Sequence, residues 1–177
     1  VVLSAVSGTT NSLVEIGQAY LAGDKAVAAE LIKNLKSKYE VFIKDLFAKP
    51  EYLQQGREVI DYHFDLLSNL SNDLFTNIEE KIILAQGELI STTLYHVYLK
   101  EAGVPSVLLP ALDFMKIDED NEPMVDYITA HITPLLDAHP DNNLFITQGY
   151  ICRNSFGEID NLRRGGKVGI ASCREGV

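Results

Sequence analysis

Glu88 has the residue type and the sequence setting that suit the binding of a small positively charged group. It lies in "QGELIS", where helical spacing gives it the mostly apolar or small neighbours Leu84, Ala85, Thr92 and Tyr95. A carboxylate on such a face is rarely buried without a partner. Two roles follow for Glu88, a structural salt bridge or the binding of a substrate ammonium group.

A polar segment near the end of the chain offers the opposite charge. "TQGYICRNSFGEIDNLRRGG", residues 147–166, follows a short apolar run. Gly149 allows a ligand to approach the backbone closely, and Arg163 and Arg164 have the paired donors that hold a carboxylate or a phosphate. A solvated surface loop explains the segment equally well, because loops carry both binding residues and filler.

A third candidate is "SAVSGTTN", residues 4–11, where the first apolar strand ends and a helix begins. The free backbone N–H groups of a helix N-terminus favour an anion. The segment is not a Walker A loop, because the initial glycine and the lysine of that motif are both absent. From spacing alone, a capped turn is the simpler interpretation.

The other titratable residues indicate no further site, and no metal site is expected. The acidic run at 118–122 lacks the spacing of a calcium loop and is read as a solvated turn. Cys152 and Cys173 form neither a CxxC motif nor a Cys/His metal spacing, which indicates reduced thiols. Ordinary core or surface roles are expected for all four histidines, His63, His96, His131 and His139.

Composition excludes several classes of protein. The 177 residues fit one domain, with 46% hydrophobic and 23% charged residues. The formal net charge of −10 argues against nucleic-acid binding, which depends on clustered Lys and Arg. No apolar run approaches the roughly 20 residues of a membrane span, and no signal peptide opens the chain. We therefore expect a cytoplasmic protein with no nucleic-acid or membrane partner.

Hydrophobic spacing predicts a strand followed by several helices. The strand is "VVLSAVSG", and Thr9, Thr10 or Asn11 is the expected N-cap of a helix that stops at Gly23. The 3- and 4-residue spacing over 24–47 predicts a long amphipathic helix.

Pro50 ends that long helix, and a second helix is expected over 51–74. The capping-box spacing of Thr76 and Glu79 starts a third, which ends at Gly103.

The pattern then changes to short strands. "VPSVLLPAL", "DFMKI" and "NLFITQG" are predicted strands, and 124–136 is a predicted helix whose last turn is weakened by Pro134. Strand, helical insert, strand, helix and strand in this order predict an α/β domain with a mainly parallel sheet. The insert, residues 24–103, is unusually long for a simple crossover.

The three candidate segments together resemble the aspartokinases. The resemblance rests on "VVLSAVSGTTNSL", on "GELISTTL" followed by "AGVPSVLLPALD", and on "ITQGYICRNSFGEIDNLRRGG", in that order over 1–166. It implies an αβα-layered, amino-acid kinase-like fold that is incomplete and carries the helical insert. The whole chain, 1–177, would then be a partial domain, the substrate-side lobe.

The resemblance also implies a reaction. Aspartokinases transfer the γ-phosphoryl group of ATP, with Mg²⁺, to the side-chain carboxylate of L-aspartate, giving 4-phospho-L-aspartate. This is the entry step to lysine, threonine and methionine. An aspartate carboxylate, with a pKa near 3.9, is already an anion at neutral pH and needs no general base. Positioning and electrostatic stabilisation must therefore carry the catalysis.

By the same resemblance, site residues are expected in the first segment. Ser4 and Thr10 would lie at the aspartate and phosphoryl-transfer site, with Thr10 also contacting the substrate. Ser4, Ser7 and Gly8 would meet the nucleotide.

The other two segments would hold the amino acid. Glu88 would bind the α-ammonium and Arg164 a carboxylate of the substrate, while Gly149 and Tyr150 would line the pocket.

Two departures from the family pattern shape the expected function. The strand motif Lys-Phe-Gly-Gly-Thr/Ser-Ser is missing, and Lys167 and Val168 stand where the family has Ser-Asp. Arg163 replaces a glycine, and "KVGIASCREGV", 167–177, does not continue the pattern. We therefore expect a truncated piece with an atypical tail, from an out-of-frame reading, a cloning remnant or an unusual gene model.

Three functional interpretations follow. The first is an aspartokinase parent of which this chain is an inactive fragment. The second is a non-catalytic piece that binds aspartate or self-associates as a homodimer, because incomplete sheets expose edges. The third is an amino-acid kinase with another acyl acceptor.

The missing motifs generate a prediction. The 177-residue chain should show no aspartate-dependent release of ADP from ATP, because the phosphate-binding lysine and the Ser-Asp pair are absent. A coupled ADP assay measures this, with a complete aspartokinase as the positive control. ADP release above background would contradict the expectation.

Overall fold

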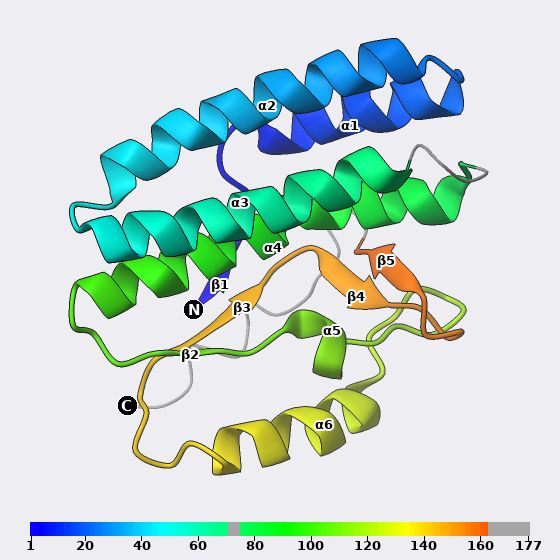
Figure 1. Ribbon diagram of the computed structural model, residues 1–177. Helices are drawn as coiled ribbons and strands as arrows, with labels where there is room; N and C mark the ends of the chain where they lie inside the picture. The colour runs from blue at the N-terminus through cyan, green and yellow to red at the C-terminus, as the bar shows by residue number, and fades with distance from the viewer. Residues whose placement is uncertain (71–74, 163–177) are drawn as a thin grey trace.

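The computed structural model describes residues 1–70 and 75–162, and Figure 1 shows them in layers. Long helices form one side, a small parallel sheet lies beneath them, and a further helix covers the opposite side of the sheet. The predicted αβα layering and parallel sheet are confirmed. Arg163, Arg164 and the tail at 167–177 lie outside the described residues.

Four long helices make up the helical side. Asp24 caps the second of them, its side chain accepting a hydrogen bond from Val27 N at 3.0 Å. The predicted capping box at Thr76 and Glu79 is present at the start of the fourth. The helices are α1 (Thr9–Leu21), α2 (Lys25–Leu46), α3 (Pro50–Asn69) and α4 (Asn77–Glu101).

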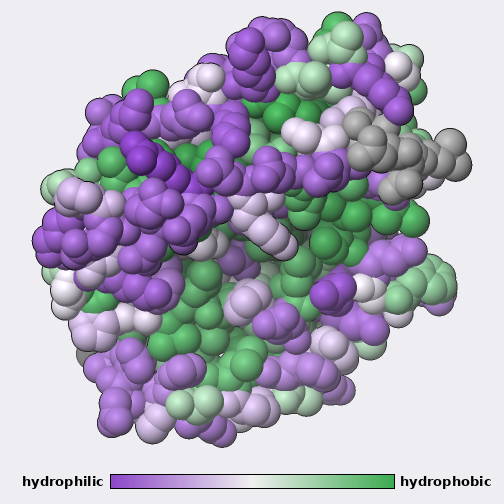
Figure 2. All heavy atoms as spheres, in the orientation of Figure 1, coloured by the Kyte–Doolittle hydropathy of each residue, from purple (hydrophilic) through white to green (hydrophobic). Residues whose placement is uncertain are grey.

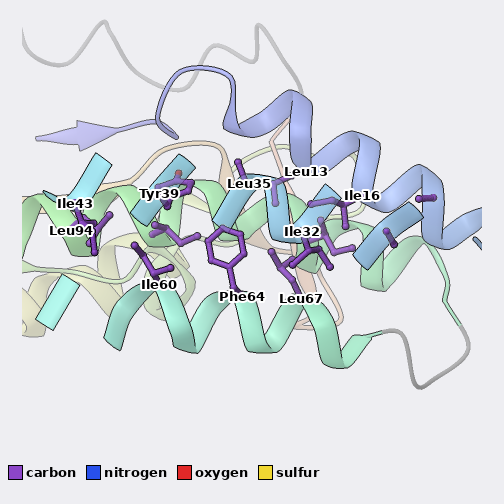
Figure 3. Close-up of a cluster of buried hydrophobic side chains, with 14 of the residues drawn as sticks. Leu13, Ile16, Ile32, Leu35, Tyr39, Ile43, Ile60, Phe64, Leu67 and Leu94 are labelled. Atoms are coloured by element: carbon purple, nitrogen blue, oxygen red, sulfur yellow. The ribbon is translucent and has the colours of Figure 1, made fainter. Parts of the chain in front are cut away.

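The main core lies between these helices, as Figure 3 shows. Helices α1, α2 and α3 each turn one apolar stripe inward, as the spacing over 24–47 predicts for α2, while α4 is buried on several faces between these helices and the sheet. Burying a side chain of this size stabilises the fold by about 1.5–3 kcal/mol. Residues that are almost fully enclosed include Leu13, Ile16, Ile43, Ile60, Phe64, Leu67, Ile83, Ile90 and Leu94.

The sheet has three parallel strands in the order β1-β3-β2. Leu3 pairs with Gln148 and Leu108 with Ile146, so the carboxyl ends of the strands meet at one edge. The strands are β1 (Val2–Leu3), β2 (Val107–Leu108) and β3 (Phe145–Gln148).

Several local predictions are wrong. A strand is expected over "DFMKI", 113–117, but Asp113 and Phe114 belong to helix α5 (Ala111–Phe114). Lys116 and Ile117 each make an isolated β-bridge. Gln148 fixes the start of this helix, because its Oε1 accepts the N–H of Ala111 at 2.7 Å.

The prediction of a loop after β3 is also wrong in part. It contains an antiparallel hairpin of β4 (Ile151–Arg153) and β5 (Ile159–Asn161). At the start of α1 none of Thr9, Thr10 and Asn11 is the N-cap. Gly8 is, at φ 81°, where glycine avoids the strain of a side chain.

Helix α6 (Val125–Asp137) covers the other side of the sheet and continues through Pro134. Its half-buried Ile128, Ile132 and Leu135 pack on a second apolar cluster. Figure 2 shows hydrophobic side chains gathered between this layer and the helical layer, and hydrophilic ones over the outer helix faces. Within the described ranges no helix is long and apolar enough to cross a membrane.

Two helical glycines give a matched stability prediction. A Cβ added at Gly56 would lie 2.6 Å from Cε2 of the buried Phe47, whereas one added at Gly17 would meet only Glu80 Cγ, at 3.4 Å. Gly56→Ala should lower the free energy of unfolding by about 1–3 kcal/mol through overpacking. Gly17→Ala should raise it by about 0.5–1 kcal/mol through reduced backbone entropy of the unfolded chain. Urea unfolding measures both, and effects of the same sign would contradict this packing.

Candidate functional site

The predicted residues Ser4 and Gly149 lie together at the carboxyl edge of the sheet. Each directly follows a strand residue of the Leu3–Gln148 pair. Gly149 N donates to Leu3 O at 2.8 Å, and an added Cβ at Gly149 would lie 3.3 Å from Val2 Cγ1. The close approach at this glycine is thus made by β1 itself. Ligands of open α/β sheets bind at such an edge.

Helix α4 brings Glu88 to the same edge. Ala5 N donates to Glu88 Oε1 at 3.3 Å, and Ser91 Oγ donates to Ser4 O at 2.8 Å. Glu88 is 4% exposed, and its Oε2 has no hydrogen-bond partner among the described residues. Burial raises the pKa of Glu88, and the Ala5 N–H opposes that rise. One carboxylate oxygen is therefore enclosed and available for a donor.

The salt-bridge role considered for Glu88 finds no support in the part of the chain that the structure describes. The ion pairs there are Lys36–Asp61 at 2.7 Å and Lys81–Asp160 at 2.6 Å. The predicted charge pair of Glu88 with Arg164 remains a prediction, because Arg164 lies outside the described residues.

Gly87 is what allows Glu88 to come this close. A Cβ added at Gly87 would lie 2.8 Å from Ala5 Cβ and 3.3 Å from Leu13 Cδ1, so any side chain would push α4 off the β1–α1 connection. The sequence analysis missed this role. A lone glycine within a helical pattern was the available signal, because it often marks a close approach.

A buried polar chain, also missed, fixes the same turn of α4. Gln148 Nε2 donates to Thr92 Oγ1 at 2.8 Å, and Thr92 Oγ1 donates to Glu88 O at 2.8 Å. Together with the bond from Ala111 N to Gln148, this chain ties α4, β3 and α5. The signal was a glutamine inside the apolar run "LFITQG", since buried amides need partners.

The β1–α1 connection carries the remaining predicted residues. Ser4, Ser7 and Gly8 are exposed and Thr10 is half-buried. Gly8 provides no side-chain cap for α1, so no capping side chain occupies the amides of the first turn. A hollow of about 90 Å³ opens here between the start of α1 and α2; it is lined by residues that include Ser7, Gly8, Ser12, Lys38 and Tyr39.

Tyr150 stands at the turn between β3 and β4 with φ 65°. An aromatic residue rarely adopts this left-handed conformation, and such strain tends to occur at functional sites. Its carbonyl accepts Leu162 N at 2.7 Å, and its side chain is half-buried beside the second apolar cluster. The structure thus places Tyr150 next to Gly149 at the sheet edge, while its contact with aspartate remains a prediction.

The chain resembles known aspartokinases in sequence and in fold. No family model matches the chain. A bifunctional aspartokinase/homoserine dehydrogenase 2 of Escherichia coli (strain K12) is 27% identical over 170 residues, which covers 93% of this chain and 20% of that protein.

Solved structures agree in fold. Escherichia coli aspartokinase III with lysine and aspartate has a TM-score of 0.74 at 22% identity, and its form with aspartate and ADP has 0.70 at 23%. Each comparison covers 93% of this chain and 37% of that one. The aspartate kinase of Clostridium acetobutylicum has 0.66 at 13% identity over 92% of this chain. The chain is related to the aspartokinases. It corresponds to part of their amino-acid kinase fold, as predicted.

Two other potentially reactive side chains in the described part of the chain, His63 and Cys152, have structural roles. His63 Nδ1 lies 2.7 Å from Gln86 Oε1, and burial lowers the pKa of His63, which indicates a neutral core histidine. Burial raises the pKa of Cys152 to about 12, so its thiol is unreactive at neutral pH. Within the described ranges, no three His, Cys, Asp or Glu side chains are grouped to hold a metal ion.

The burial of Glu88 predicts how stability depends on pH. A carboxyl whose pKa is raised by folding adds stability below its unfolded pKa of about 4.5, and this stability is lost as pH rises through the folded pKa. Glu88→Gln should therefore unfold at a higher temperature than the unaltered chain at pH 8, by the equivalent of about 1 kcal/mol. The difference should shrink as pH falls towards 4.5.

Glu79→Gln is the matched control on the same helix. Hydrogen bonding to Thr76 lowers the pKa of Glu79, so its contribution has the opposite pH dependence. Glu79→Gln should destabilise at pH 8 and approach the unaltered chain as pH falls. Thermal unfolding between pH 4 and 8 checks both, and a Glu88→Gln variant that is less stable at pH 8 would contradict the expectation.

Proposed function

We propose that this chain forms the aspartate-binding part of an aspartokinase, which phosphorylates the side-chain carboxylate of L-aspartate with ATP. The observation that carries the proposal is the Glu88 carboxylate at the sheet edge. It is 4% exposed, bonded through Oε1 to Ala5 N and unpartnered at Oε2. A buried anion of this kind is stabilised by a cationic donor, and the α-ammonium of an amino acid is one.

The other predicted residues would complete the site. With the substrate nitrogen at Glu88 Oε2, we propose that Arg164 binds a substrate carboxylate and that the reacting carboxylate meets the connection that holds Ser4 and Thr10. Gly149 and Tyr150 adjoin this edge. The reacting carboxylate is ionised at neutral pH, so the protein's task is to orient it and offset charge repulsion, with no proton to remove.

The nucleotide would approach the β1–α1 connection. Ser4, Ser7 and Gly8 are exposed there, and the amides at the start of α1 suit a phosphate. ATP supplies the phosphoryl group; this chain's residues bind and orient. Mg²⁺ binding remains a prediction. Among the described residues, no three or more His, Cys, Asp or Glu are grouped to hold a metal ion.

The activity of a whole enzyme is proposed only for a longer protein. The chain spans 20% of the curated relative and 37% of the first solved relatives. In such a protein the site would serve lysine, threonine and methionine synthesis in the cytoplasm. We also propose residues 24–103, which contain α2, α3 and α4, as the helical insert of this lobe.

A self-associating piece is the second candidate. Strand β1 stands at one edge of the sheet, and Val1 and Val2 are 60% and 67% exposed. Exposed apolar edge strands template pairing with another chain. Sedimentation velocity distinguishes this role, because a dimer that forms without aspartate and binds none would favour it.

The proposed function predicts a charge-specific binding pattern. L-Aspartate should bind the chain, and succinate, which lacks the ammonium group, should bind far more weakly. Glu88→Gln should reduce aspartate affinity by about 30-fold or more, since losing one partner of a buried charge pair costs about 2–5 kcal/mol. Isothermal titration calorimetry at pH 8 measures these affinities.

Glu101→Gln provides the matched control. Glu101 is on the same helix and accepts the N–H groups of Ala48 and Lys49, at 3.1 Å and 2.6 Å to Oε1, at the far end from the site. This variant should keep the affinity for aspartate. Absence of aspartate binding, or equal binding of succinate, would overturn the proposal; preference for glutamate or carbamate would favour another amino-acid kinase.

A further inference from the structure

A buried pair of hydroxyl groups joins α2 to the start of α1. Thr9 Oγ1 and Tyr39 OH lie 2.9 Å apart, and the two residues are 2% and 3% exposed. Thr9 is the first residue of α1 and precedes Thr10. Figure 3 shows Tyr39 on α2, among the side chains of the buried cluster. A hydrogen bond enclosed this fully is costly to break, because each hydroxyl would lose its partner without gaining water.

Thr9 is held from two sides. Its hydroxyl contacts Tyr39, while its Cγ2 lies 3.5 Å from the position of a Cβ added at Gly87. A β-branched side chain has few allowed rotamers, so the hydroxyl bond with Tyr39 also fixes the direction of the Thr9 methyl group. The hydroxyl pair therefore ties α2 to the start of α1, while the Thr9 methyl group faces the turn of α4 that carries Glu88.

The electrostatics place Tyr39 near that carboxylate as well. Burial is the main reason that the pKa of Tyr39 is raised; the hydrogen bond with Thr9 opposes the rise, and the negative charge of Glu88 adds to it. The phenol is thus neutral at physiological pH and lies within electrostatic range of Glu88.

We propose that Tyr39 is a positioning residue for the aspartate site, acting through Thr9 to hold the start of α1 and the Ala5 amide against Glu88. The inference rests on the proposed function. Tyr39 would not touch the substrate. Its hydroxyl would instead fix the geometry in which Ala5 N engages Oε1 and leaves Oε2 for the ammonium.

Three variants test this role by separating stability from binding. Tyr39→Phe and Thr9→Val each leave one buried hydroxyl without a partner, so each should lower the melting temperature. The double variant removes both hydroxyls and should recover most of that loss. Aspartate affinity should fall about fivefold in all three, the equivalent of one hydrogen bond. A merely structural role predicts that affinity returns together with stability in the double variant.

Two further variants serve as controls. Thr9→Ser keeps the hydroxyl and removes the buried methyl group beside Gly87, so it should lose stability and keep aspartate affinity. Tyr52→Phe removes the hydroxyl of a half-buried tyrosine on α3 and should change neither. Loss of affinity in Thr9→Ser equal to that in Thr9→Val would overturn the proposal.

Hydrogen exchange in the ligand-free chain separates this inference from the proposed function. The exchange rate of the Ala5 amide should rise about fivefold in Tyr39→Phe, Thr9→Val and the double variant. In Tyr52→Phe the rate should be unchanged. If the unaltered chain binds no aspartate but Ala5 exchange accelerates as expected, the aspartate function fails and the positioning of Ala5 against Glu88 stands. Unchanged Ala5 exchange in the double variant overturns the positioning role whatever aspartate does.

Discussion

A carboxylate enclosed at the carboxyl edge of a parallel sheet is the constraint on which this structure depends. Glu88 has one backbone donor, Ala5 N, for two oxygens. Burying an ionised group with so little compensation lowers stability. The surrounding structure must therefore hold it there, and it does so through the close packing at Gly87 and the chain of hydrogen bonds from Glu88 O through Thr92 to Gln148.

The same arrangement would couple binding to stability at the proposed site. An unpartnered Oε2 destabilises the empty protein, and a bound ammonium would remove that penalty. Sites of this kind often carry local strain that the rest of the fold offsets. Here the offset comes from the helical core, in which Leu13, Ile43 and Phe64 are almost fully buried. The left-handed Tyr150 at the adjacent turn is a second strained position.

The similarity to aspartokinases offers one explanation for these features of the sheet edge. Sequence identity with the curated relative is 27%, yet the similarity extends over 93% of the chain. The TM-scores of 0.74 and 0.70 show that the fold is shared. The Thr9–Tyr39 pair adds to this a contact between a long helix and the proposed site, so α2, which packs on α1 and α3, would also take part in shaping the pocket.

The sequence by itself determined the features that depend on neighbours a few positions apart. The spacing over 24–47 predicted α2, Thr76 and Glu79 predicted the cap of α4, and "NLFITQG" predicted β3. Such patterns are readable because a helix turn or a strand repeats over a few residues. The three segments in order also carried the family resemblance, including Glu88.

Only the tertiary structure decided what depends on residues far apart in the chain. Ala5 and Glu88 are 83 positions apart and Gln148 and Ala111 are 37 apart. No local pattern shows that Gln148 would bond to the start of α5, that Gly87 would lie against the β1–α1 connection, or that Oε2 would be left without a donor. Burial and hydrogen-bond satisfaction depend on how the whole chain packs. For that reason the sequence shows that Glu88 carries a charge, but it does not show that one of its oxygens lacks a partner.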